Sequence, residues 1–163
     1  MTDAVVYVVM GVTAAGKTTL GEHLSKALKM PFIEGDELHP ESNVAKMAAG
    51  VPLTDEDRWP WFANIAAAVN QIQGPAIVSC SALKRAYRDY LRSALTGPVK
   101  YLWLNPDKEA LEQRLLARQD HFMPASLLNS QLETLETPLS EKDVIDVTGR
   151  SVSEICAELE LMA

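Results

Sequence analysis

The chain has 163 residues, and this length predicts one domain that buries roughly 70% of its unfolded surface. Acidic residues outnumber basic ones by 22 to 15, and the formal charge of −7 argues against binding to nucleic acid or anionic membranes. No apolar run is long enough to span a bilayer. Cys80 and Cys156 lack metal-type spacing and an upstream secretory signal, so we expect reduced thiols and a location in the cytoplasm.

Short apolar runs alternate with segments of helical period along the chain. The predicted strands are residues 4–10, 31–34, 76–79, 100–104 and 144–147. The predicted helices are residues 18–29, 40–49, 55–73, 83–95, 107–118, 124–136 and 151–162. This alternation predicts an α/β fold with three layers, α/β/α, around a mainly parallel five-stranded sheet. Because no linker or repeat interrupts it, we expect residues 1–163 to form a single domain.

The first predicted strand leads into residues 11–18, which match the pattern G-x-x-x-x-G-K-[ST] and open a helix. This setting predicts a P-loop NTPase fold. Glycines let the backbone N–H groups face phosphates, Lys17 reaches the outer phosphates and assists catalysis, and the Thr18 hydroxyl can bind Mg²⁺. The alternative, a glycine turn with a solvated lysine, explains less of the pattern. The residues expected to bind nucleoside triphosphate are Gly11, Val12, Thr13, Ala14, Ala15, Gly16, Lys17, Thr18 and Thr19.

Ligands of open parallel sheets lie beyond the carboxyl ends of the strands, where residues 35–39, 80–85 and 146–150 should join the loop around one cleft. Asp36 follows a predicted strand, so it can accept a proton from an acceptor hydroxyl or act on Mg²⁺ indirectly. His39 is close enough in sequence to share that pocket. Taken alone, an Asp at a strand end is more often a cap or turn former than a catalyst, but the phosphate loop alongside Asp36 reverses that preference. His39 is as consistent with a surface or turn residue.

Basic residues gather on one predicted helix. Arg85, Arg88 and Arg92 have i, i+3 and i+7 spacing, which places them on one broad face. Guanidinium groups suit a carboxylate or phosphate, so we expect Arg85 and Arg88 to bind substrate and Arg92 to lie at the surface.

A second pair of arginines precedes a short insert. Arg114 and Arg118 are four residues apart near the end of a predicted helix. Arginines at the base of an insert can close over ATP and stabilise charge on the moving phosphoryl group, so Arg114 and Arg118 are expected to bind ATP and Arg118 to be catalytic. The alternative is that they complement the helix dipole.

Two absences narrow the class of nucleotide-binding protein. The sequence has no N-K-x-D stretch of the kind that GTP-specific switches use, and the run at 76–80 ends without the acidic pair typical of motor ATPases. A small-molecule kinase fits best.

Several motifs, in family order, closely resemble the gluconokinase family. They are Gly35-Asp36-Glu37-Leu38-His39-Pro40, Asn43, Lys46-Met47, Gly50, Pro52-Leu53, residues 55–61, residues 80–84, Tyr87-Arg88-Asp89, residues 121–124, Ser130-Gln131 and Leu135-Glu136. The resemblance implies a fold like that of nucleoside monophosphate kinases, with a short lid at about residues 119–136. It also implies transfer of the ATP γ-phosphate to the 6-hydroxyl of D-gluconate, and often a homodimer.

Carried over to this chain, the resemblance places ATP in the phosphate loop, Mg²⁺ on Thr18 and the acceptor hydroxyl at Asp36. One departure is Ala14-Ala15, where family loops commonly carry Ser or Gly; backbone N–H groups do the cradling, so the loss of a hydroxyl should be tolerated. From placement alone, residues 148–150 are expected beside adenine. The residues implied to line the substrate pocket are Asp36, His39, Lys46, Arg58, Arg85, Arg88 and His121.

Two alternatives stay open from sequence. One is another small kinase, acting on shikimate or a nucleoside monophosphate. The other is a nucleotide-binding switch module with little turnover.

Overall fold

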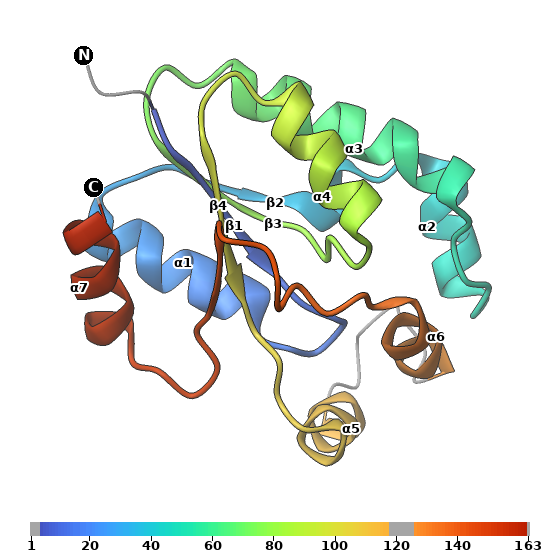
Figure 1. The fold of residues 1–163 in the computed structure, drawn as a ribbon. Coiled ribbons are helices and arrows are strands. Elements are labelled where there is room, and N and C mark those ends of the chain that lie inside the picture. Colours follow the sequence, from blue (N-terminus) through green and yellow to red (C-terminus); the bar gives the residue numbers. More distant parts are fainter. Residues whose placement is uncertain (1–3, 118–125, 163) are drawn as a thin grey trace.

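The computed structural model describes residues 4–117 and 126–162 (Figure 1). Within this part, the sheet consists of β1 Val6–Met10, β2 Phe32–Glu34, β3 Ala76–Ser79, β4 Val99–Trp103 and β5 Val144–Asp146. The strand order is β2-β3-β1-β4-β5, and every neighbouring pair is parallel. Val8 of the central strand, for example, lies beside Val78 and Tyr101. The predicted five-stranded parallel sheet is confirmed.

Helices connect the strands in the predicted order. They are α1 Lys17–Leu28, α2 Glu41–Ala48, α3 Asp55–Asn70, α4 Arg85–Ala94, α5 Lys108–Ala117, α6 Ser126–Thr134 and α7 Val152–Met162, with the 3₁₀ turn η1 Gly35–Leu38 after β2. The largest difference from the predicted bounds is that α3 ends at Asn70 rather than at residue 73. The chain tightens there, because the Ile72 N–H bonds the Val69 carbonyl three residues back, ahead of Gly74 with its φ of 128°.

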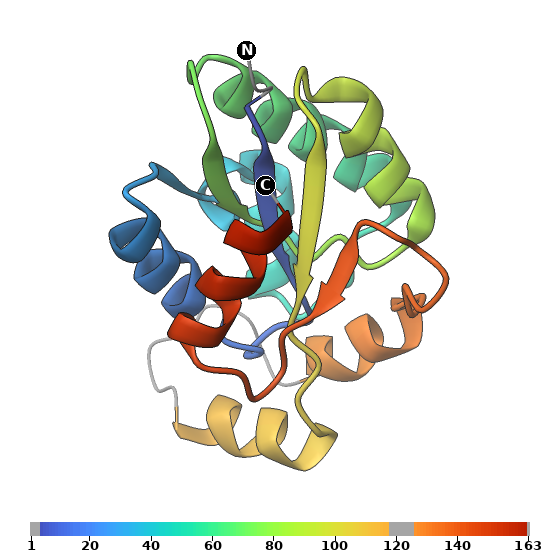
Figure 2. The same ribbon diagram turned by 60° about the vertical axis from the view of Figure 1, so that its left-hand side comes forward.

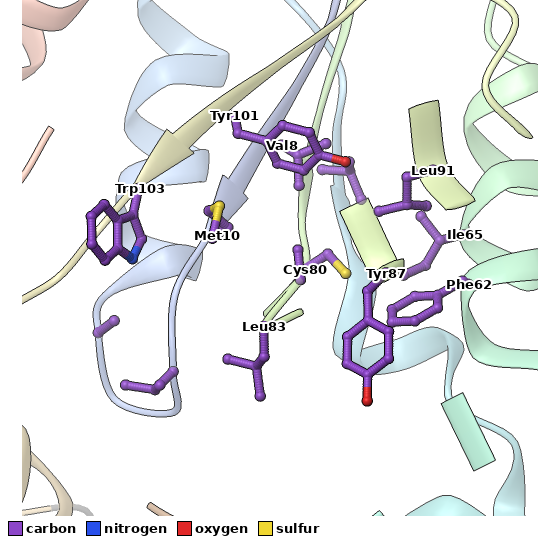
Figure 3. Packing of buried hydrophobic residues seen from close by; sticks show 14 of the residues in the cluster. Val8, Met10, Phe62, Ile65, Cys80, Leu83, Tyr87, Leu91, Tyr101 and Trp103 are labelled. Carbon is purple, nitrogen blue, oxygen red and sulfur yellow. The ribbon is translucent and has the colours of Figure 1, made fainter. Parts of the chain in front are cut away.

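The sheet is covered on both faces, as the alternation of side chains along β1 requires. Val8 and Met10 pack in one apolar cluster with residues of α3 and α4 (Figure 3). Tyr7 and Val9 belong to a second apolar cluster with residues of α1 and α7. These two helices lie on the face of the sheet opposite to α3 and α4 (Figure 2). The three predicted layers are therefore present, and the rigid central strand carries the phosphate loop at its carboxyl end.

The turn η1 was not predicted, and it depends on a close approach that only glycine permits. A Cβ added at Gly35 would lie 1.9 Å from the Ser79 carbonyl oxygen. The Gly35 N–H donates to Ser79 Oγ at 3.0 Å, and Trp61 Nε1 donates to the Gly35 carbonyl at 2.8 Å. These contacts fix the start of η1 against the end of β3, which places Asp36 at the carboxyl edge of the sheet.

In the described part of the chain, no helix combines the length and the apolar character needed to cross a membrane.

Candidate functional site

The phosphate loop joins β1 to α1 and curls back on itself. Gly16 has a φ of 100° and Ala14 a φ of 67°, both in the left-handed region that such a tight curve needs. Lys17 Nζ donates to the carbonyls of Gly11 at 3.0 Å and Val12 at 2.9 Å. The lysine amine is thus held inside the curve of the loop, where the outer phosphates of a nucleotide would lie.

Beside the loop, a carboxylate contacts the expected magnesium ligand. The Thr18 hydroxyl donates to Glu34 Oε2, and the Ser79 hydroxyl donates to the other oxygen of the same carboxylate. Glu34 is the last residue of β2, so the sheet brings it next to the start of α1. Sequence reasoning missed Glu34, although the rule that ligands gather at strand ends could have identified it.

A main cleft opens between the loop, η1, α3 and α6. It brings together the predicted residues Asp36, His39 and Arg58 with the phosphate loop. The full lining is Thr13, Ala14, Gly16, Lys17, Thr18, Thr19, Asp36, His39, Met47, Pro52, Leu53, Arg58, Trp61, Ser81, Leu127, Ser130 and Gln131. The cleft therefore places cations, a carboxylate and hydroxyl groups around one space.

His39 is held in one orientation. Its side chain is 2% exposed and stacks on Trp61, with ring centroids 3.9 Å apart. Burial, followed by the nearby charge of Arg58, lowers the pKa of His39 to about 4. The neutral ring accepts from Asn43 Nδ2 at Nδ1, 3.2 Å away, so Nε2 carries the proton and lies 3.9 Å from Asp36 Oδ1. His39 therefore offers the cleft a neutral N–H donor.

Lys46 does not line the main cleft. Its Nζ lies 2.7 Å from Asp57 Oδ2, and that carboxylate also accepts from the Thr54 N–H in the capping box that begins α3. The bond from Lys46, followed by that from Thr54, lowers the pKa of Asp57 to about 2. Lys46 thus ties α2 to the first turn of α3.

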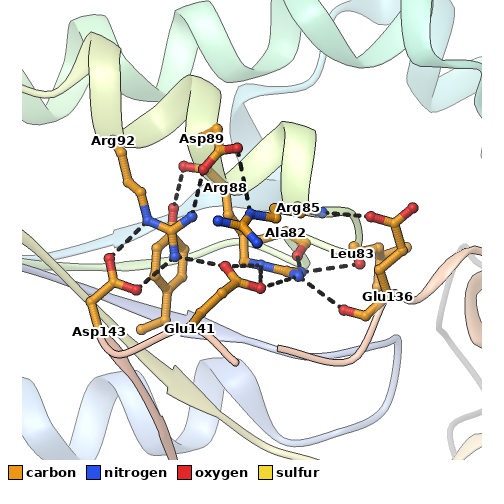
Figure 4. Close-up of polar contacts among 10 residues, drawn as sticks. Ala82, Leu83, Arg85, Arg88, Asp89, Arg92, Glu136, Glu141 and Asp143 are labelled. Atoms are coloured by element: carbon orange, nitrogen blue, oxygen red, sulfur yellow. Dashed lines mark hydrogen bonds and ion pairs between the residues drawn. The ribbon is translucent and has the colours of Figure 1, made fainter. Parts of the chain in front are cut away.

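Two of the predicted substrate-binding arginines, Arg85 and Arg88, line neither the main cleft nor the second cleft beside the phosphate loop. Figure 4 shows them among polar partners of this chain. Arg88 is fully buried, and its guanidinium bonds Glu141 and the carbonyls of Ala82, Leu83 and Glu136. Because its N–H groups are engaged there, Arg88 holds the segment after α6 against α4.

Arg85 and Arg92 lie on the same helix. The Arg85 side chain is 63% exposed, and its Nε lies 3.8 Å from Asp89. Arg92, expected at the surface, is only 23% exposed and pairs with Glu141 and Asp143. The broad basic face of α4 thus serves mainly to bind acidic residues of this chain.

A side cleft lies on the other flank of the phosphate loop. Arg114 Nη1 donates to the carbonyls of Ala14 at 3.1 Å and Ala15 at 3.0 Å, which connects α5 to the loop. The side cleft is lined by Ala14, Ala15, Gly16, Thr19, Leu20, His23, Leu104, Arg114, Arg150, Ser151 and Val152. Arg150, from the segment expected beside adenine, therefore shares this cleft with Arg114.

Helix α6 forms a further wall of the main cleft. The Thr13 N–H donates to Gln131 Oε1 at 2.7 Å, so this helix contacts the phosphate loop directly. Gln131 belongs to the motifs of the family resemblance, but no pattern in the sequence indicates which group it contacts. The predicted residues Arg118 and His121 lie outside the described residues.

The sequence is similar to those of known proteins over most of its length. Residues 6–138 match a family model described as an AAA domain. A gluconokinase of Gluconobacter oxydans is 45% identical, covering 93% of this chain and 86% of the relative. The thermosensitive gluconokinase of Escherichia coli is 41% identical, covering 86% of this chain and 77% of the relative.

The fold is also similar to those of solved kinase structures. A gluconokinase from Sinorhizobium meliloti superposes with a TM-score of 0.83 and 45% identity, covering 97% of this chain and 90% of the other. A shikimate kinase from Aquifex aeolicus, at 16% identity and a TM-score of 0.57, shares the fold alone. With its phosphate loop, its main cleft and these near full-length similarities, the chain belongs to the gluconokinase family of P-loop kinases.

Proposed function

We propose that this protein is an ATP-dependent gluconokinase, which transfers the γ-phosphate of ATP to the 6-hydroxyl of D-gluconate. The observation that carries the proposal is the main cleft, where the Asp36–His39–Arg58 group faces the phosphate loop. Gluconate is a linear polyhydroxy carboxylate. Its site needs a cation for the carboxylate, donors and acceptors for the hydroxyls, and a carboxylate near the reacting oxygen.

The nucleotide is assigned to the phosphate loop and the side cleft. Backbone N–H groups of residues 11–18 and the Lys17 amine would bind the phosphates, and the adenine would lie between Arg114 and Arg150. Arg118 remains the proposed second cation for the moving phosphoryl group, and Thr19 a further phosphate contact.

Magnesium fits beside the loop. Mg²⁺ prefers oxygen ligands and usually binds through one or two protein groups together with substrate phosphates. The Thr18 hydroxyl and the Glu34 carboxylate, already in contact, supply two such oxygens. When bound there, Mg²⁺ would neutralise charge on the β- and γ-phosphates.

The acceptor is assigned to the opposite side of the main cleft. Asp36, 40% exposed, would accept the proton of the attacking 6-hydroxyl. The neutral N–H of His39 would donate to a substrate hydroxyl, and Arg58 would bind the carboxylate. His121 stays a proposed contact, whereas Lys46 and Arg88 would act from a distance, through the segments that they hold in place. No contact is assigned to Arg85, whose side chain pairs with Asp89 on its own helix.

The remaining features of the proposal follow the family resemblance. We propose that residues 1–163 form one kinase domain with a lid at about 119–136, that it functions as a homodimer, and that it acts in the cytoplasm. The homodimer is tested by sedimentation equilibrium, where a single species of monomer mass would contradict it.

The activity is tested by following formation of 6-phosphogluconate from D-gluconate, ATP and Mg²⁺. Coupling to 6-phosphogluconate dehydrogenase gives NADP⁺ reduction as the readout. Shikimate and AMP are assayed separately for ADP release. Signal with gluconate alone supports the proposal. Signal only with shikimate or AMP would assign another small-molecule kinase, and ATP binding without turnover of any acceptor would favour a switch module.

A further inference from the structure

A chain of polar contacts leads from the surface of α3 and α4 into the main cleft. Lys84 Nζ lies 3.1 Å from Asp55 Oδ1, and the Tyr87 hydroxyl bonds the same carboxylate oxygen. Arg58 Nη1 lies 2.8 Å from the Tyr87 hydroxyl. Arg58 is the last residue in this series of contacts, and it lines the main cleft. The contacts thus connect a cleft residue to a carboxylate that lies outside the cleft lining.

The directions of these hydrogen bonds follow from the groups. A guanidinium only donates, so the Tyr87 oxygen accepts from Arg58. An ionised carboxylate only accepts, so the Tyr87 O–H donates to Asp55. The bond from Tyr87, followed by that from Lys84, lowers the pKa of Asp55, while burial and Asp55 raise the pKa of Tyr87 to about 12. The tyrosine therefore keeps its proton, and both sides of its hydroxyl are occupied.

Tyr87 is also fixed in position. It is 1% exposed, with its ring centroid 5.6 Å from that of Trp59 in an edge arrangement and 5.1 Å from that of Phe62. Arg58 Cζ lies 5.3 Å from the Tyr87 ring centroid, so the arginine contacts the tyrosine through both its ring and its hydroxyl. The guanidinium plane of Arg58 is thereby set by a rigid aromatic cluster.

We propose that Tyr87, supported by Asp55, is a positioning residue that determines how well the acceptor carboxylate is bound. This inference rests on the proposed function, in which Arg58 binds the carboxylate of gluconate. A guanidinium binds a carboxylate best through two parallel N–H groups, and such pairing requires a fixed plane. Tyr87 anchors Nη1, so the remaining N–H groups of Arg58 are presented to the cleft in one direction.

The proposal is tested by steady-state kinetics of Tyr87→Phe, Arg58→Lys and the double variant. Tyr87→Phe is expected to raise the KM for gluconate about tenfold, with kcat and the KM for ATP within about twofold of the parent. In the Arg58→Lys background, Tyr87→Phe is expected to add no further loss, because no guanidinium remains to be oriented.

Tyr90→Phe is the matched control. Tyr90 lies on the same helix, and its ring centroid is 5.7 Å from that of Trp59. Within residues 4–117 and 126–162, its hydroxyl makes no hydrogen bond, so this variant should match the parent in every constant.

Two results would overturn the inference. One is an unchanged KM for gluconate in Tyr87→Phe. The other is a parallel rise of both KM values with a lower melting temperature, which would make Tyr87 merely structural. A parent enzyme that binds ATP but does not phosphorylate gluconate would instead contradict the proposed function, and the parent assay distinguishes that failure from the other two.

Discussion

Gln131 of α6 accepts a hydrogen bond of 2.7 Å from the backbone N–H of Thr13, and so joins a cleft wall to the phosphate loop across 118 residues of sequence. Gln131→Ala removes this acceptor and loosens α6. Because α6 borders the main cleft proposed for the acceptor and also contacts the phosphate loop proposed for ATP, we expect the KM values for ATP and gluconate to rise together, by about three- to tenfold. Gln113→Ala, on the exposed part of α5, is the control. A normal KM for both substrates in Gln131→Ala would contradict this role.

Asp36 is expected to act in the chemical step. Asp36→Asn keeps the size of the side chain but removes the proton acceptor, so kcat should fall by about 10²-fold or more while the KM for ATP changes little. The measurement is the coupled assay at saturating ATP. Glu37→Gln, the exposed neighbour in η1, should retain parental kcat. Comparable kcat in Asp36→Asn would remove this carboxylate from the chemistry.

Glu34 should govern the response to magnesium. In Glu34→Gln, the Thr18 hydroxyl keeps an oxygen partner, but the negative charge is lost. We expect the Mg²⁺ concentration for half-maximal activity to rise about tenfold, because a carboxylate attracts the cation more strongly than an amide. Titration of activity with MgCl₂ at fixed free ATP measures this shift. The same half-maximal concentration in variant and parent would exclude Glu34 from the magnesium site.

Acid should destabilise the protein through His39. Its pKa is lowered from 6.5 to about 4 in the folded state, so the unfolded chain binds more protons between these values. The contribution of His39 to the free energy of unfolding is therefore fully present above about pH 6.5. It is lost as the pH falls toward and below 4, and the total loss is about 3 kcal/mol. Urea unfolding at several pH values measures this loss.

A histidine variant isolates that contribution. His39→Gln should unfold with a weaker dependence on pH between 6.5 and 4, while His23→Gln, exposed on α1, should follow the parent. The low pKa of Asp57 acts below this window, since its stabilisation is lost only below its ordinary value of 3.8. Parallel curves for His39→Gln and the parent would show that the buried ring does not titrate as inferred.

Arg88 should matter for stability rather than for substrate contact. Arg88→Met leaves Glu141, which is 5% exposed, with Arg92 as its remaining ionic partner. Removing one member of a buried ion pair costs about 3 kcal/mol or more. Arg85→Met, at an exposed position, should cost less than about 0.5 kcal/mol. Equal unfolding free energies for the two variants would contradict the assignment of Arg88 to the buried network.

The contrast between these arginines shows where sequence reasoning stops. The phosphate loop, Asp36 and their strand ends follow a local pattern, and the parallel sheet brings them together wherever it forms. The placement of Arg88 depends instead on Glu141, which lies 53 residues away. Helical spacing predicts that Arg85, Arg88 and Arg92 share a face, but it does not identify what covers that face.

Glu34 and Tyr87 were overlooked for related reasons. Glu34 ends an apolar run, which predicts only a strand residue, and its contacts with Thr18 and Ser79 appear only when α1 and β3 lie beside it. The sequence marks Tyr87 only as part of a family motif, because its partners come from α3 and no periodicity relates the two helices.

Among the described residues, the proposed acceptor contacts Asp36, His39 and Arg58 all come from the single stretch 36–58, whereas the proposed nucleotide contacts come from 11–19, 114 and 150. The stretch follows β2, which is an edge strand of the sheet. The phosphate loop follows β1, which is the central strand. Under the proposed function, these three contacts with the acceptor thus lie in one segment at the edge of the sheet, while Tyr87, which positions Arg58, lies outside it on α4. We expect an exchange of that segment to change the acceptor while the phosphate loop on β1 keeps its place.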